Sequence, residues 1–278
     1  MGKHLIDVAG LRAADDPLVF DCRHRLDDPG WGRRAFAEGH LPGARHLHLD
    51  EELSGRIEPG PNGPRGGRHP LPDPETFGAL MRRHGLRAGR LVVALDDAGN
   101  PFAARLWWLL RWLGHDAVRV LDGGLAAWTA AGGELVAGDA GEVAPGDWRP
   151  RPDPARIAEH ARVAAIAAGA GAGATVVDVR DPARYRGEHE PIDPVGGHIP
   201  GAINRPWKEL LDESGRLARA PAVPGGPLVF SCGSGVTACV GLLALAEHAG
   251  REDALLYPGS WSGWLAEGGG VESGPPRQ

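Results

Sequence analysis

The sequence predicts an α/β fold that occurs twice in tandem, each copy a mainly parallel sheet flanked by helices. Two observations support this prediction. Short, apolar, β-branched runs alternate with helical patterns, which is typical of a parallel sheet covered by helices. Four motifs also occur twice, in the same order, once in each half of the chain. Such an ordered set of matches indicates two copies of one fold.

The repeated motifs align the two halves residue by residue. The pairs are LVFDCR (18–23) with TVVDVR (175–180), GHLPGA (39–44) with GHIPGA (197–202), LVVALDD (91–97) with PLVFSCG (227–233), and DGGLAAW (122–128) with PGSWSGW (258–264). The alignment that places Trp128 on Trp264 without a gap also places Asp96 opposite Cys232. The first copy is the longer one between its motifs.

A Gly- and Pro-rich segment separates the copies and is typical of a linker. The expected domains are residues 1–135 and 153–278, joined by the linker 136–152. Asp153-Pro154 resembles a helix start, so the second domain is expected to open with a helix over 154–168. The further elements expected in that domain are strands at 175–180, 227–232 and 253–259 and a helix over 236–250 ended by Gly250.

Composition narrows the function classes. The 278 residues are 42% hydrophobic, carry a net charge of −6 and contain three cysteines. The charge and the lack of long basic runs argue against a nucleic-acid partner, and few cysteines suit a reducing compartment. No signal peptide is evident, and the densest apolar run (101–114) is too short to span a membrane. A soluble cytoplasmic protein is expected.

The loop after the strand 227–232 has the features of a nucleophile site. Gly233 and Gly235 allow a tight turn with inward N–H groups, and the following helix adds the positive end of its dipole. Such a ring, which continues through Val236, Thr237 and Ala238, would stabilise a Cys232 thiolate. Free cysteine is also among the most buried residue types, so the loop alone leaves a structural cysteine open.

A cysteine phosphatase is disfavoured by the same loop. Those enzymes grip phosphate with an arginine six residues after the cysteine. Here that position is Ala238, and the loop contains no cation.

The motifs SCGSGVTA, GHIPGA and LYPGSWSGW, in two tandem copies, resemble those of the two-domain rhodanese-type sulfurtransferases. The resemblance covers nearly the whole chain and implies a double displacement without metal or organic cofactor. Cys232 would take sulfur from a small donor as a persulfide and pass it to cyanide, a small thiol or a thioredoxin-like protein. In that family the first domain often carries an aspartate in place of the cysteine, as Asp96 does here. Its members are often monomers.

Thiosulfate-specific members of the family carry Arg and Lys after the cysteine, whereas this chain has neutral Gly233 and Ser234. The loop instead resembles that of the 3-mercaptopyruvate sulfurtransferases. The resemblance implies a Cys-Ser-Asp arrangement with Ser234 and Asp50, and a histidine, His69, that handles protons as pyruvate leaves.

Arg184, in ARYRG, matches the family's substrate-binding arginine and suits a carboxylate. The second arginine of that segment is replaced by Ile192. Arg180, Arg186 or an arginine of the 56–68 loop could substitute. Thiosulfate therefore stays open as the donor, and a persulfide carrier or docking module with weak turnover stays open as the other class.

Several other residues are interpreted as structural. Asp21, Arg23, Asp178, Arg180, His40 and His198 occur in both copies, which favours a role in the fold. His46 and His48 lack partners at metal spacing, so no metal site is expected. The core is expected to bury Cys22, Cys239, Trp107, Trp108 and Trp112.

Overall fold

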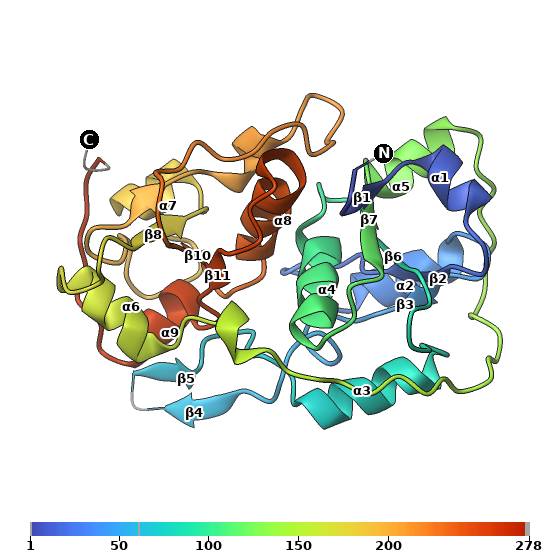
Figure 1. Ribbon diagram of the computed structural model, residues 1–278, viewed down its shortest axis with the longest axis horizontal. Coiled ribbons are helices and arrows are strands. Elements are labelled where there is room, and N and C mark those ends of the chain that lie inside the picture. Colours follow the sequence, from blue (N-terminus) through green and yellow to red (C-terminus); the bar gives the residue numbers. More distant parts are fainter. Residues whose placement is uncertain (1, 61, 276–278) are drawn as a thin grey trace. The chain divides into compact units, whose positions relative to one another are not determined.

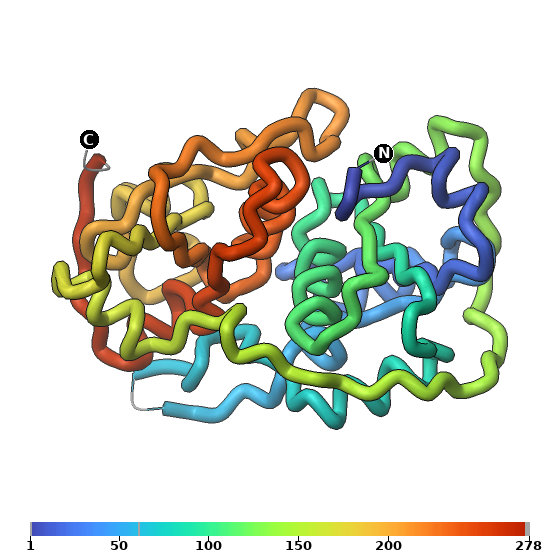
Figure 2. Tube along the Cα trace, viewed as in Figure 1, coloured from blue at the N-terminus to red at the C-terminus, as the bar shows by residue number. Residues whose placement is uncertain are grey.

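The computed structural model describes residues 2–60 and 62–275, and the chain divides into two compact units (Figure 1). The first unit comprises the residues up to Gly55, Pro72–Asp153 and Asp212–Leu217; the second comprises Arg56–Leu71, Pro154–Leu211 and the residues from Ala218 onward. The loop 56–71, which lies in the first copy of the sequence repeat, thus groups with the second unit. Figure 2 traces this path, with the loop in cyan.

The first unit is built on a five-stranded parallel sheet with the order β1-β7-β6-β2-β3. Its strands are β1 (Leu5–Ile6), β2 (Leu18–Asp21), β3 (Arg45–His46), β6 (Val92–Leu95) and β7 (Val118–Leu121). Its helices are α1 (Val8–Ala13), α2 (Trp31–Glu38), α3 (Pro74–Arg83), α4 (Pro101–Trp112) and α5 (Gly124–Ala130). Asp7 and Asp73 cap α1 and α3 by accepting backbone N–H bonds.

The second unit is built on a four-stranded parallel sheet with the order β11-β10-β8-β9 and carries the hairpin β4–β5. Its strands are β4 (Glu58–Gly60), β5 (Gly63–Arg65), β8 (Thr175–Asp178), β9 (Ile203–Asn204), β10 (Leu228–Ser231) and β11 (Leu255–Leu256). Its helices are η1 (Pro154–Arg156), α6 (His160–Ala167), α7 (Pro182–Arg186), η2 (Trp207–Leu210), α8 (Ala238–Ala249) and α9 (Ser260–Ala266). The predicted fold class, a parallel sheet flanked by helices in each copy, is confirmed.

The repeated polar residues make the same contacts in both units. Arg23 pairs with Asp21 at 2.7 Å, and Arg180 pairs with Asp178 at 2.6 Å. His40 stacks on Phe36 and hydrogen-bonds its carbonyl oxygen, and His198 does the same with Tyr185. The structural interpretation of these repeated residues is confirmed.

The expected helix over 154–168 is wrong in its first part. Pro154–Arg156 is a single 3₁₀ turn, and the α-helix begins only at His160. Between them, Ile157 forms a parallel bridge with Leu256, and the Ala158 N–H donates to the Leu256 carbonyl at 2.8 Å. A helix through these residues would break this pairing, which repeats the β1–β7 pairing of the first unit.

The other elements of the second unit follow the predicted pattern. Helix α8 begins at Ala238, two residues later than expected, and ends at Ala249; the cap that follows is Gly250, whose φ of +64° suits glycine. The core of this unit includes buried Tyr185, Trp261 and Trp264. In the first unit α4 is buried along its whole length, and this confirms the packing role of its tryptophans. Among the described helices none has the length and hydropathy needed to cross a bilayer.

Candidate active site

Cys232 follows β10 directly, at the carboxyl end of a central strand of the parallel sheet. The Gly235 N–H donates to its sulfur at 3.1 Å. Its own N–H donates to the Ser260 hydroxyl at 3.0 Å, and that hydroxyl lies 3.9 Å from the sulfur. Ser260 sits at a φ of +48°, uncommon for a residue with a side chain. The Ser260 hydroxyl also donates to the Tyr257 carbonyl at 3.0 Å, so the Gly235 N–H is the close donor to the buried sulfur and suits negative charge there.

The turn around the sulfur requires glycine at position 235. Its φ is +81°, and a Cβ there would lie 2.5 Å from the Pro258 carbonyl oxygen. The backbone thus comes close to the segment that precedes α9 while the Gly235 N–H stays aimed at Cys232.

Ser234, two residues after Cys232, forms a hydrogen bond with His69. His69 Nδ1 lies 2.7 Å from Ser234 Oγ, and both residues are buried. His69 comes from the 56–71 loop. The preceding residue, Arg68, anchors this loop because its backbone N–H donates to Ser262 Oγ at 3.1 Å. The long insertion of the first copy therefore delivers a titratable side chain to the cysteine loop.

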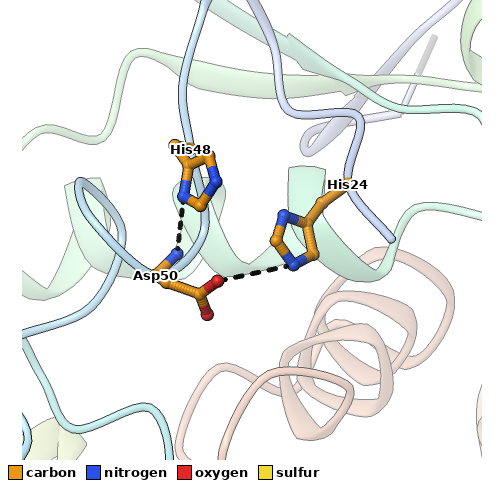
Figure 3. A group of neighbouring side chains, drawn as sticks. All are labelled: His24, His48 and Asp50. Atoms are coloured by element: carbon orange, nitrogen blue, oxygen red, sulfur yellow. Dashed lines mark hydrogen bonds and ion pairs between the residues drawn. The ribbon is translucent and has the colours of Figure 1, made fainter. Parts of the chain in front are cut away.

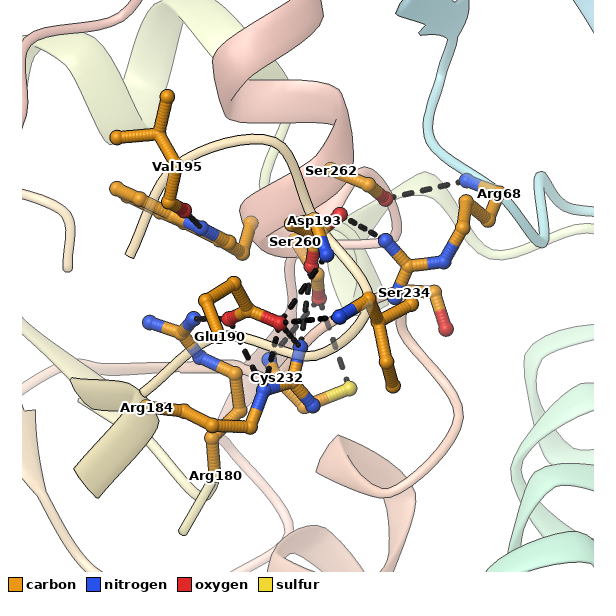
Figure 4. Close-up of polar contacts among 12 residues, drawn as sticks. Arg68, Arg180, Arg184, Glu190, Asp193, Val195, Cys232, Ser234, Ser260 and Ser262 are labelled. Carbon is orange, nitrogen blue, oxygen red and sulfur yellow. Dashed lines mark hydrogen bonds and ion pairs between the residues drawn. The ribbon is translucent and has the colours of Figure 1, made fainter. Parts of the chain in front are cut away.

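Two arginines lie beside the cysteine loop (Figure 4). A Cβ placed on Gly233 would be 3.0 Å from Arg68 Nη2 and 3.4 Å from Arg184 Nη2. Arg184 is the residue expected there, and Arg68 belongs to the 56–68 loop whose arginines were named as possible substitutes. Of the other two possible substitutes, Arg180 pairs with Asp178 and with Glu190, and Arg186 pairs with exposed Glu188.

Two buried carboxylates hold these arginines (Figure 4). Asp193 accepts from Arg68 through one oxygen and from Arg184, at 3.1 Å, through the other. Glu190 accepts from Arg184 at 2.8 Å and also from the backbone N–H groups of Ile192 and Asp193. Burial raises the pKa of Glu190, but the bonds from Arg184 and from the two backbone N–H groups together outweigh it and hold the pKa below its usual range.

Asp50 lies in the first unit, where its turn is fixed by histidines (Figure 3). The Asp50 N–H donates to His48 Nδ1 at 3.2 Å, and His24 Nε2 lies 3.8 Å from Asp50 Oδ2. The three side chains bring ligand-type atoms within 4.8 Å of one another. However, His48 Nε2 also bonds the Pro29 carbonyl, so both of its nitrogens are used in hydrogen bonds. This cluster shapes the turn that carries Asp50; the role of Asp50 with His69 stays a prediction.

Comparison with known proteins identifies the family. The model of the rhodanese-like domain matches the chain twice, over residues 6–131 and 163–267. The chain belongs to the rhodanese-like family.

The relatives of this rhodanese-like chain match it over most of their length. A Pseudomonas aeruginosa protein provisionally named 3-mercaptopyruvate sulfurtransferase is 43% identical over 94% of this chain and 93% of its own. A Mycobacterium tuberculosis protein provisionally named thiosulfate sulfurtransferase SseB is 41% identical over 94% and 92%. The crystal structure of the Escherichia coli 3-mercaptopyruvate sulfotransferase SseA superposes with a TM-score of 0.77 at 31% identity, over 93% of this chain and 98% of that one.

The first rhodanese-like domain fills the equivalent loop with its own carboxylate. Asp96 follows β6 as Cys232 follows β10, and it is almost wholly buried. Four backbone N–H groups, from Ala98, Asn100, Phe102 and Ala103, donate to it at 2.9–3.0 Å. The strand-end loop of this fold can therefore surround an anion with amides. In the second domain the position at the centre of the loop is a sulfur.

The remaining predicted residues complete the loop, and some contributors escaped prediction. Val236, Thr237 and Ala238 form the turn into α8. Cys22 and Cys239 are buried, as expected. Asp193, Glu190 and Ser260 were not predicted, although all three stand inside short motifs, EPID (190–193) and PGSWSGW (258–264). The sequence signal that could have pointed to these residues was their position inside motifs that were already recognised.

Proposed function

We propose that the protein takes sulfur from 3-mercaptopyruvate as a persulfide on Cys232 and passes it to a small thiol, cyanide or a thioredoxin-like protein. The chain is an enzyme of the sulfurtransferase class, as its relatives are. The observation that carries the choice of donor is the buried Ser234–His69 pair beside the cysteine loop. We further propose that it acts as a cytoplasmic monomer in which only the second domain is catalytic.

The first chemical step is an attack at sulfur. The Cys232 thiolate forms a bond to the sulfur of 3-mercaptopyruvate, and the bond between that sulfur and its carbon breaks. The electron pair of the broken bond goes to the pyruvate fragment, which leaves as its enolate. The Gly235 N–H, 3.1 Å from the sulfur, suits the charge that the persulfide carries.

The departing enolate needs a proton, and the Ser234–His69 pair can provide for it. The Ser234 hydroxyl can donate a hydrogen bond to the oxygen on which charge develops. His69, 2.7 Å from Ser234 Oγ, can relay a proton through it. Asp50 is proposed to take part in the same proton handling. Sulfite, which leaves when thiosulfate is the donor, needs no such proton.

Arg68 and Arg184 are proposed to bind the carboxylate of the donor. Both guanidinium groups lie against Gly233, next to the nucleophile. A planar carboxylate is the partner that a pair of guanidinium forks recognises best. Gly233 lacks a side chain, so an anion can approach the backbone between them.

The test of the proposal compares two donors at one acceptor. Incubation with 3-mercaptopyruvate should add the mass of one sulfur atom to the protein at Cys232, and cyanide should remove it. The value of kcat/KM should then be higher for 3-mercaptopyruvate than for thiosulfate. A higher value for thiosulfate would replace the proposal by the thiosulfate:cyanide reaction, for which the two arginines beside Gly233 would be the anion-binding groups. Sulfur uptake without turnover would indicate a persulfide carrier.

Arg184→Ala should raise KM for 3-mercaptopyruvate about tenfold or more, because a charge-assisted contact worth ~1.5–3 kcal/mol is lost. Steady-state kinetics with cyanide as acceptor measure this change. Arg186→Ala is the matched control, since Arg186 pairs at the surface with Glu188, and its KM should stay as in the wild type. An unchanged KM in Arg184→Ala would remove this residue from the substrate site.

Ser234→Ala should lower kcat with 3-mercaptopyruvate by about 10²-fold or more, the usual contribution of a positioned acid–base group. The loss with thiosulfate should be much smaller, because sulfite leaves without a proton. His69→Gln should reproduce this selectivity. Equal losses with both donors would show that the pair supports the loop and not the protonation step.

A further inference from the structure

Asp193 stands between the two arginines of the site. One of its oxygens accepts from Arg68 Nη1, and the other lies 3.1 Å from Arg184 Nη2 (Figure 4). Its side chain is only 3% exposed. A carboxylate of the protein thus already engages the two guanidinium groups that face Gly233.

The position of Asp193 is fixed by its own loop. Its N–H donates to Glu190 Oε1 at 3.1 Å, and Glu190 in turn holds Arg184. The loop is tied to the domain core because Trp261 Nε1 donates to the Val195 carbonyl at 2.9 Å. Asp193 is therefore part of a built network and does not swing freely out of the site.

The charges of this network balance. Arg68, Arg180 and Arg184 carry three positive charges, and they contact three buried carboxylates, which belong to Asp178, Glu190 and Asp193. An incoming anion therefore meets arginines whose field is largely compensated. The repulsion from a fixed carboxylate at short range is twice as large for a dianion as for a monoanion.

We propose that Asp193 sets the charge of the donor that the enzyme accepts, favouring a monoanionic carboxylate such as 3-mercaptopyruvate over dianionic thiosulfate. The inference rests on the proposed function, whose anion-binding pair is Arg68 and Arg184. Asp193 leaves each arginine enough donors for one carboxylate and removes the excess positive charge that a dianion requires. The neutral Gly233–Ser234 turn, which adds no cation of its own, acts in the same direction.

Asp193→Asn tests the proposal, because it removes the charge and keeps the shape and one accepting oxygen. The ratio of kcat/KM for thiosulfate to kcat/KM for 3-mercaptopyruvate should rise by roughly tenfold. A purely structural role would change both values by the same factor and leave the ratio as it was. The control Glu188→Gln removes one negative charge from the same segment at an exposed position and should leave the ratio unchanged.

Arg68→Gln removes a positive charge from the same network, so it should shift the ratio in the opposite direction. This test does not depend on the folding of the Asp193 variant. Arg68 is partly exposed, and loss of its charge should move the ratio several-fold toward 3-mercaptopyruvate. If Asp193→Asn folds and its ratio is unchanged, the proposal is overturned. If Asp193→Asn does not fold, an unchanged ratio in Arg68→Gln overturns the proposal. A wild type that prefers thiosulfate would contradict the proposed function instead, and the change of the ratio between wild type and variant would still decide the role of Asp193.

Discussion

Cys232→Ser is expected to abolish sulfur transfer from both 3-mercaptopyruvate and thiosulfate, with kcat/KM lowered at least about 10³-fold. Serine is a much weaker nucleophile and cannot hold the transferred atom as a persulfide. The loop should keep its shape, because serine preserves the hydrogen bonds of the backbone at this position, such as the one from the residue 232 N–H to Ser260 Oγ. Cyanide-dependent thiocyanate formation and the intact mass after donor treatment measure the loss.

The other two cysteines supply matched controls for this prediction. Cys239 is buried in α8 and Cys22 follows β2 in the first domain. Cys239→Ala and Cys22→Ala should still gain one sulfur atom and transfer it. Turnover that survives in Cys232→Ser would contradict the persulfide mechanism at Cys232. A sulfur atom found on Cys239 would show that Cys239 carries the persulfide.

The fold could be predicted from the sequence because each of its copies supports the other. Strands β6 and β10 and the loops after them were placed by aligning Trp128 with Trp264. The same repeat could have corrected the helix expected over 154–168. Ile157 takes the place in its sheet that β1 takes in the first one, and a local cap signal at Asp153-Pro154 outweighed that correspondence.

The site could be predicted only where a motif carried it. Cys232, Ser234 and Arg184 stand in short patterns, and the structure places Ser234 and Arg184 beside Gly233 in the cysteine loop. That Arg68 lies beside Gly233 could not be predicted from the sequence. It depends on where the hairpin β4–β5 packs and on a contact with Asp193, 125 residues away along the chain. Such long-range packing leaves no local periodicity.

Arg180→Met is expected to have the largest effect on stability, lowering the free energy of unfolding by about 3–5 kcal/mol. The substitution leaves Asp178 buried without its partner, at a site where both side chains are at most 3% exposed. It also removes the hydrogen bond to the Gly197 carbonyl and the contact of the guanidinium with the Trp261 ring. Urea denaturation measures the loss, with each transition of the two-domain protein fitted separately.

The first domain contains the matched control for this substitution. Arg23 makes the same bonds to Asp21 and to the Gly39 carbonyl, so Arg23→Met should destabilise the first domain to a similar extent. Arg180 alone also contacts Glu190, which holds Arg184 beside the cysteine loop. At temperatures where both variants are folded, only Arg180→Met should therefore raise KM for 3-mercaptopyruvate. Equal kinetic effects of the two substitutions would mean that the Asp178–Arg180 pair contributes to the fold but does not position Arg184.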